Sequence, residues 1–175
     1  MRFALIGVGK HGARWAGVLG DSLIVVVDPK SSPIKLKDAL ANKSIDAVLI
    51  ATPHEDLAPI TFRALQAGKH VLCEKPGAIM AEDILALNAL ARRKHLVYKI
   101  GYNYRFHDGF IKARKLYEKG AIGDLLFIRA SHGFGRKKEY QEWRINKETG
   151  GGHLRDQGVH MIDMARSFMG KIDKV

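Results

Sequence analysis

The first 28 residues constrain the fold more than any other stretch, because they place a strand, a glycine-rich turn, a helix and a second strand in order. Residues 3–6 form an apolar run that suits a buried parallel strand. Residues 7–12 read Gly-Val-Gly-Lys-His-Gly, a helix with small and apolar residues follows, and residues 23–27 form a second apolar run. This order predicts the opening β-α-β unit of a doubly wound parallel sheet.

The glycines of this turn have separate physical roles. Gly7 permits the tight turn, Gly9 lets the backbone approach a pyrophosphate, and Gly12 lets the helix pack closely on the strand. The pyrophosphate would lie on free N–H groups at the positive end of the helix. Asp28, at the end of the second strand, can accept hydrogen bonds from a ribose diol. The pattern therefore predicts a dinucleotide site. The alternative is a glycine-rich turn that binds nothing.

Strand and helix patterns continue to alternate after this unit. We expect three further buried strands and two longer helices, with the strands at residues 46–51, 70–74 and 96–101 and the helices at residues 57–67 and 82–94. Alternation at this spacing favours an α/β fold with a doubly wound parallel sheet.

The pattern changes after residue 101. Residues 109–119 predict a helix, residues 125–132 a long strand, and residues 153–169 a second helix. We therefore divide the chain into a dinucleotide-binding domain, residues 1–110, and the start of an incomplete α+β domain, residues 111–175.

Composition narrows the choice of partner and compartment. The formal net charge of +11 favours anionic ligands such as a dinucleotide, or nucleic acid as the alternative. The short basic clusters at residues 92–94 and 136–138 are not interleaved with aromatic residues, so we expect no nucleic-acid partner. No apolar run is long enough for a membrane span. The single cysteine, Cys73, lies in an apolar run, which favours a buried thiol and a cytoplasmic location.

The candidate site lies where the strands end, because open parallel sheets bind ligands outside the carboxyl ends of their strands. Lys75 follows the predicted strand at residues 70–74, and a lysine there, beside a nicotinamide, can polarise or protonate a substrate oxygen. The alternative is that Lys75 is an ordinary surface lysine without a role in catalysis. The proline after it fixes the chain where the strand stops, which favours the functional interpretation. The candidate cofactor residues are Gly7, Gly9, Lys10, His11, Gly12, Asp28, Ala51, Thr52, Pro53, His54, Glu74, Lys75 and Pro76.

A second candidate is the D-x-G-x-H sequence from Asp156 to His160. Residues at i and i+4 share one face of a helix, and an acid one turn from a histidine can orient it for proton transfer. A surface pair is one alternative, and a metal site that includes His153 and Asp163 is another. Spacing alone leaves all three interpretations open.

The segments GVGKHG, ATPH, AGKHVLCEKP, GYNYRFH, GAIGDLLFIRA and GGGHLRDQGVHMID together resemble the glucose–fructose oxidoreductase and inositol dehydrogenase family, Gfo/Idh/MocA, over nearly the whole chain. The resemblance implies a Rossmann domain followed by an α+β domain, and oxidation or reduction of a sugar, cyclitol or nucleotide-sugar carbon with NAD or NADP. It matches Lys75, Asp156 and His160 to the catalytic positions. It implies substrate contacts for Asn103, Arg105 and His160, and no metal. The run at residues 140–144 is similar to that of sugar and surface-polysaccharide members.

These matches predict a proton path. Hydride transfer from a carbon needs a base for the hydroxyl proton and a donor for the developing oxyanion. We expect His160 to be the base, Asp156 to orient it, and Lys75 to donate to the same oxygen.

The sequence departs from the family in two places. The stretch between Asp28 and Asp46 is too short for the family's helix and strand, which opens the adenine-ribose side of the cofactor site. Asp28 favours NAD, but Lys30 and Lys35 can meet a 2′-phosphate, so NADP is the alternative. Family members are also roughly twice as long, as two complete domains require. Three interpretations of the chain therefore stay open. It is a fragment, it is completed by a second copy or another chain, or it is a non-catalytic dinucleotide-binding or regulatory module.

Overall fold

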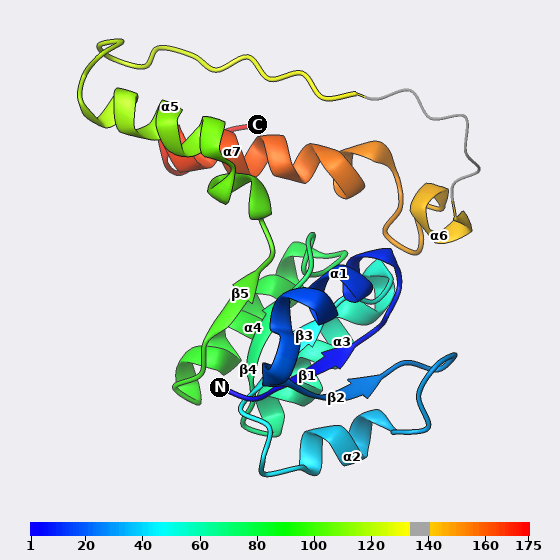
Figure 1. Cartoon of the computed structure of the whole chain (residues 1–175). Coiled ribbons are helices and arrows are strands. Elements are labelled where there is room, and N and C mark those ends of the chain that lie inside the picture. Colours follow the sequence, from blue (N-terminus) through cyan, green and yellow to red (C-terminus); the bar gives the residue numbers. More distant parts are fainter. Residues whose placement is uncertain (134–140) are drawn as a thin grey trace.

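The computed structural model describes residues 1–133 and 141–175. Within these ranges five parallel strands form one sheet in the order β2-β1-β3-β4-β5 (Figure 1). This arrangement confirms the predicted doubly wound α/β fold. The strands are β1 (Phe3–Ile6), β2 (Leu23–Val27), β3 (Ala47–Ile50), β4 (His70–Cys73) and β5 (Tyr98–Ile100).

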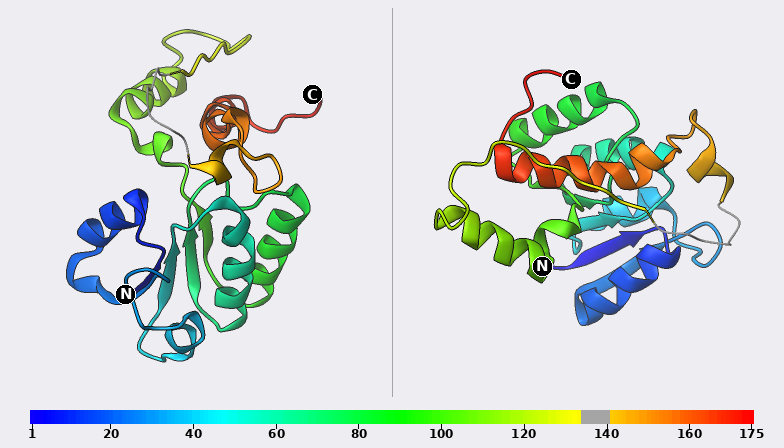
Figure 2. Two further views of the ribbon diagram at one scale, coloured as in Figure 1. Left: turned by 90° about the vertical axis from the view of Figure 1, so that its right-hand side faces the viewer. Right: turned by 90° about the horizontal axis from the view of Figure 1, so that it is seen from above.

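Helices cover both faces of the sheet. Helix α1 lies on one face, and α3 and α4 pack side by side on the other (Figure 2). Between β2 and β3 the chain forms only the short helix α2 and no strand, as the short stretch predicted. The bounds are α1 (Lys10–Leu19), η1 (Gly20–Ser22), α2 (Leu36–Ala41), α3 (His54–Gln66) and α4 (Ala81–Arg93).

The apolar core lies between the central strands and their helices. All four residues of β3 are buried, as expected for a central strand covered on both faces. Leu57 and Leu65 bring the apolar side of α3 onto this sheet, and Leu87 and Leu90 do the same for α4. Burial of each such side chain contributes about 1.5–3 kcal/mol. The core therefore fixes the strand ends on which the candidate site is built.

The rest of the described chain lies beyond the carboxyl edge of the sheet. Helices α5 and α7 run alongside one another there (Figures 1 and 2). The guanidinium of Arg114 in α5 lies 4.8 Å from the ring centroid of Phe168 in α7. The elements are η2 (Asn103–Phe106), α5 (Asp108–Glu118), α6 (Glu142–Ile145), the π-helical turn η3 (Leu154–Gly158) and α7 (Val159–Met169).

The predicted strand at residues 125–132 is not formed, so this expectation was wrong. The segment is extended but has no strand partner among the described residues (Figure 1). A strand needs a neighbour to satisfy its backbone N–H and C=O groups, and an apolar run alone does not supply one. Leu126 is 84% exposed and Phe127 77% exposed as a result.

Candidate functional site

A cavity of about 410 Å³ opens at the carboxyl ends of the central strands. Most of the predicted cofactor residues line it, which brings together segments from three separate strand ends. These are Gly7, Gly9, Lys10, His11, Asp28, Ala51, Thr52, Pro53, His54, Glu74 and Lys75, and the predicted catalytic residue Asp156 lines the same cavity.

The glycine turn has the close contacts that its sequence predicts. Gly7 has φ +87°, and a Cβ there would lie 2.8 Å from the carbonyl oxygen of Ala51. A Cβ on Gly12 would lie 2.0 Å from the carbonyl oxygen of Gly7, so Gly12 packs α1 against the turn and does not line the cavity. A Cβ on Gly9 would meet no atom of the described residues within 4 Å. The space beside Gly9 is therefore open to a ligand.

Helix α1 begins at this open space, with Gly9 as its N-cap and Lys10 and His11 lining the cavity. The free N–H groups and the dipole of a helix N-terminus attract anions. Trp15 Nε1 donates a 2.8 Å hydrogen bond to Oε1 of Glu74 at the end of β4, which links α1 to the sheet. The residues present fit the pyrophosphate of a dinucleotide.

Asp28 is held with its carboxylate at the rim of the cavity. Oδ2 accepts a 2.8 Å hydrogen bond from the backbone N–H of Val8, and Oδ1 accepts one of 2.9 Å from that of Lys30. These backbone hydrogen bonds hold the pKa of Asp28 below its ordinary value. The carboxylate is therefore charged and oriented, and each oxygen keeps a lone pair for a ribose hydroxyl.

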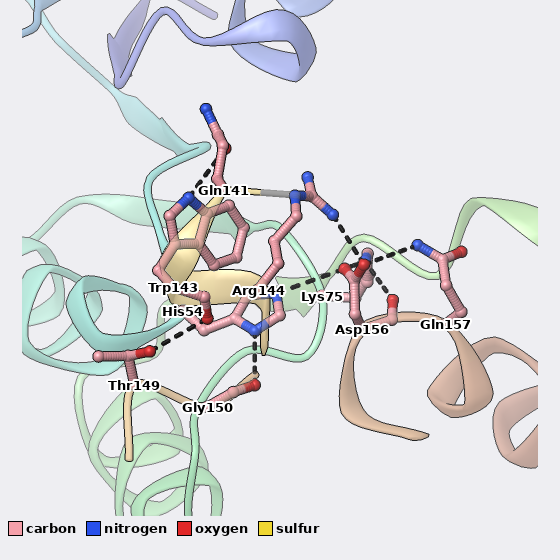
Figure 3. A network of polar contacts seen from close by, with 9 residues as sticks. All are labelled: His54, Lys75, Gln141, Trp143, Arg144, Thr149, Gly150, Asp156 and Gln157. Carbon is pink, nitrogen blue, oxygen red and sulfur yellow. Dashed lines mark hydrogen bonds and ion pairs between the residues drawn. The ribbon is translucent and has the colours of Figure 1, made fainter. Parts of the chain in front are cut away.

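Opposite the glycine turn, Asp156 joins two cations that come from different parts of the chain (Figure 3). Its Oδ1 accepts a 2.7 Å hydrogen bond from Lys75 Nζ, and its Oδ2 accepts one of 2.7 Å from Arg144. Lys75 also donates to the Asp156 carbonyl. We call this set of Lys75, Arg144 and Asp156 the polar clamp. It ties the end of β4 to η3.

Electrostatics keep the Asp156 carboxylate charged. Burial on its own raises the pKa of Asp156, but the hydrogen bond and charge of Lys75, with help from Gln157 and Arg144, lower that pKa overall. His54 lies beside the clamp, and its Nδ1 is 2.9 Å from the carbonyl oxygen of Gly150. Burial lowers the pKa of His54, so its imidazole is neutral and donates to that carbonyl.

The glycine run before η3 allows the chain to approach this closely. Gly150 has φ +83°, and a Cβ there would lie 2.7 Å from Cγ1 of Ile79. A Cβ on Gly151 would lie 2.6 Å from the backbone carbon of Arg144. A side chain at Gly150 would push this segment away from Ile79 and His54, and one at Gly151 would push it away from α6, so the two glycines place the clamp.

His160 is buried but does not line the cavity. Burial, followed by the charge of Lys75, lowers its pKa to about 4, so the imidazole is neutral at neutral pH. The expectation that Asp156 orients it was wrong, since no hydrogen bond joins the two side chains in the described part of the chain. Residues 154–158 form a π-helical turn, which does not place i and i+4 on one face as an α-helix does.

Other predicted residues lie outside the cavity. Arg105 donates to both carboxylate oxygens of Asp163, at 2.7 and 2.6 Å, and Asn103 is exposed. Pro76 is buried behind the cavity wall. Among the described residues no group of three or more His, Cys, Asp or Glu side chains is placed to hold a metal.

Several cavity residues were missed by the sequence analysis. Trp143 and Arg144 come from α6, and the Arg144 guanidinium lies 4.5 Å from the Trp143 ring centroid. The only signal for them was the run at residues 140–144, whose Tyr140 lies outside the described residues, as does the basic cluster at 136–138. The lining residues without an earlier assignment are Val8, Ser31, Gln141, Trp143 and Arg144, whereas Lys30, expected to meet a 2′-phosphate, also lines the cavity.

Two family models match the chain. One, described as an oxidoreductase family with an NAD-binding Rossmann fold, matches residues 25–102. The other, described as the GFO/IDH/MocA C-terminal domain, matches residues 110–175. The chain belongs to the Gfo/Idh/MocA family of oxidoreductases. Family membership confirms the resemblance on which the site was predicted, and the first model describes an NAD-binding domain without separating NAD from NADP.

Curated relatives of the chain carry several activities. It is 34% identical, over 79% of its length, to levoglucosan dehydrogenase from Pseudarthrobacter phenanthrenivorans, of which it covers 37%. It is 37% identical, over 75% of its length, to dTDP-3,4-didehydro-2,6-dideoxy-alpha-D-glucose 3-reductase from Streptomyces violaceoruber, of which it covers 38%. It is 29% identical, over 98% of its length, to 2,7-anhydro-N-acetylneuraminate hydratase from Escherichia coli, of which it covers 50%. The chain thus spans half or less of the length of these relatives.

Solved structures share the fold. An NAD-binding protein from Listeria innocua is 27% identical and superposes with a TM-score of 0.79, over 98% of this chain and 55% of that one. In the ranges that the structure describes, none of the helices has the length and apolar character that a membrane span needs.

Proposed function

We propose that this chain carries the cofactor site and proton-transfer groups of an NAD(P)-dependent oxidoreductase that acts on a hydroxyl or carbonyl carbon of a sugar, cyclitol or nucleotide-sugar. One observation carries the proposal: the polar clamp, with Lys75 and Asp156, lines the same cavity as Gly9 and Asp28. The levoglucosan dehydrogenase and dTDP-sugar reductase relatives support the substrate class.

A nicotinamide dinucleotide bound here would supply the hydride acceptor or donor. The N-terminus of α1 would bind its pyrophosphate, and Asp28 a ribose hydroxyl. Asp28 supports NAD, whereas Lys30, which also lines the cavity, supports NADP as the alternative.

Lys75 would bind the reacting oxygen of the substrate. Its ammonium has three N–H donors, of which two are engaged by the side chain and carbonyl of Asp156. The remaining N–H can donate to an oxygen in the cavity and stabilise the negative charge that develops there. The neutral imidazole of His160 would accept the hydroxyl proton once the substrate reaches it.

A second candidate is a dinucleotide-binding module without turnover, completed by a second copy or another chain. The observation that favours it is the length, because the chain covers only 37% to 50% of the three curated relatives named above. The two candidates separate experimentally, since the module binds cofactor but converts no sugar.

Cofactor binding is tested by fluorescence titration with NADH and NADPH. We expect Gly9→Val to weaken binding at least about 100-fold, because the new side chain would occupy the pyrophosphate space. The variant should unfold at the wild-type temperature, since a Cβ at Gly9 contacts no protein atom. Unchanged NADH affinity in a folded Gly9→Val protein would remove the cofactor proposal.

Turnover is tested by screening sugars and nucleotide-sugars for a change in nicotinamide absorbance. With an active substrate, His160→Asn and Lys75→Met should each lower the rate by roughly two to four orders of magnitude, with cofactor affinity nearly unchanged for His160→Asn. Near-normal rates in both variants would exclude this assignment of the proton path.

A further inference from the structure

The imidazole of His160 is fixed in a different way from that of most histidine bases. Its Nδ1 is buried and has no hydrogen-bond partner among the described residues, whereas the second nitrogen of such a histidine is usually fixed by a hydrogen bond. The ring of Tyr104 instead lies almost parallel to the imidazole, with centroids 4.3 Å apart and planes at 13°. Tyr102 approaches edge-on, with centroids 6.3 Å apart and planes at 86°. Ring contacts therefore take the place of the hydrogen bond.

The turn that carries Tyr104 is anchored on the same helix as His160. Arg105, the next residue in η2, donates two hydrogen bonds of 2.7 and 2.6 Å to the carboxylate of Asp163 in α7. His160 and Asp163 are three residues apart in α7, so they lie on one face of it. Figure 1 shows the chain leaving β5 and meeting α7 at this turn. Two consecutive residues of η2, Tyr104 and Arg105, thus contact two residues on one face of α7, His160 and Asp163.

We propose that Tyr104 is the positioning residue of His160, and that Arg105 keeps Tyr104 stacked by binding Asp163. The inference rests on the proposed function, in which His160 is the base. It also gives Arg105 a role other than the substrate contact implied by the family resemblance.

The stack acts on both the direction and the protonation of the imidazole. It blocks one face of the ring, so the ring plane is set although no hydrogen bond from the described part of the chain fixes Nδ1. It also keeps water from that face, which favours the neutral imidazole that a base requires. The other titratable or charged groups near the ring are Lys75, Tyr102, Arg105, His132, Asp156 and Asp163. Since Arg105 and Asp163 pair with one another, removing the Tyr104 ring changes solvation more than charge.

The test is an NMR titration of the histidine Cε1–H signals in the 175-residue chain. The His160 signal is the one missing from His160→Asn. In Tyr104→Leu we expect this signal to lose its upfield ring-current shift, and its titration midpoint to rise by about one pH unit or more toward 6.5. Tyr104→Phe keeps the ring and should preserve both properties. Arg105→Gln keeps the Tyr104 ring but frees the turn, and should reduce the ring-current shift by less than Tyr104→Leu does. Only its ring-current shift is informative, because the unpaired Asp163 carboxylate would by itself raise the pKa of His160.

The matched control is Tyr117→Leu, which removes a ring from α5 that lies 6.0 Å from that of Phe168 and away from the cavity. It should leave the His160 signal unchanged. A wild-type ring-current shift in both Tyr104→Leu and Arg105→Gln would overturn the proposal, as would an equal change in Tyr117→Leu. If Tyr104→Leu does not fold, the ring-current shift in Arg105→Gln decides. The titration needs no turnover, so a chain that binds neither NADH nor NADPH would overturn the proposed function and leave this result standing.

Discussion

The two parts of the chain, residues 1–101 and residues 102–175, are held in place by different forces. Among the described residues, every buried apolar side chain except Met164 belongs to the first part. The second part leaves large apolar side chains exposed, including Leu126 and Phe127. Its contacts with the first part at the cavity include hydrogen bonds of Asp156 with Lys75 and of Gly150 with His54, and an edge-on contact of the Trp143 ring with the His54 ring.

This difference separates folding from chemistry. The first part buries a continuous core between sheet and helices, so its geometry depends on its own sequence. The second part supplies Asp156, Arg144 and His160, and the clamp holds them against the strand ends. The proposed cofactor site is therefore built into the stable part, whereas the proposed proton path depends on docking of the other part.

The largest expected effect concerns the core. Leu49 is 1% exposed at the centre of the sheet, and Leu49→Ala should lower the free energy of unfolding by about 2–5 kcal/mol, through lost burial and the cavity left behind. Leu126→Ala is the matched control and should change it by less than about 0.5 kcal/mol. Urea denaturation measures both values. Equal costs at the two positions would show that the exposed segment is packed after all.

An intermediate effect concerns the clamp. Asp156→Asn should lower the free energy of docking of residues 141–175 by about 1–3 kcal/mol, because hydrogen bonds from two cations lose their charged acceptor. Amide hydrogen exchange should rise in α7 and stay unchanged in β1 and β3. Asp173→Asn, at an exposed position in the last residues, is the control. Unchanged exchange in α7 would mean that the clamp does not hold the second part.

The smallest effect is a pH dependence. The pKa values of His11, His54 and His160 are all lowered by burial, that of His160 to about 4. In the unfolded chain these histidines are protonated as the pH falls through about 6.5, whereas in the folded chain they are protonated only at lower pH. Stability is therefore fully present above about pH 6.5 and is lost as the pH falls toward 4.

Thermal unfolding at pH 7.5 and pH 5 measures this loss. The unfolding temperature should be lower at pH 5, and the difference should shrink in His160→Gln, which removes one of the three titrating groups. Equal unfolding temperatures for the wild type at both pH values would contradict the expectation that these histidines are neutral in the folded chain.

Sequence reasoning was accurate where structure is decided locally or by a repeated pattern. The five strands and the helices α1, α3 and α4 follow apolar runs and glycine positions, and each overlaps the stretch that the pattern predicted. It failed at residues 125–132, because a strand depends on a partner that the run itself does not specify. It also missed Trp143 and Arg144 as cavity residues, since nothing in their own neighbourhood says that α6 returns to the strand ends.

The sequence by itself determined the glycine turn, the position of Asp28 and the doubly wound sheet. Gly12 packs against the backbone of Gly7, five residues away, and Gly7 packs against Ala51 at the end of the adjacent strand. The spacing of these glycines in the sequence therefore already indicates the shape of the turn. Only the tertiary structure decided that Asp156 binds Lys75, 81 positions away, and that Tyr104 stacks on His160. An aspartate four residues before a histidine can bind several partners. Which partner it binds depends on the cation that the fold brings nearest, because a buried carboxylate is stabilised most by a charged donor.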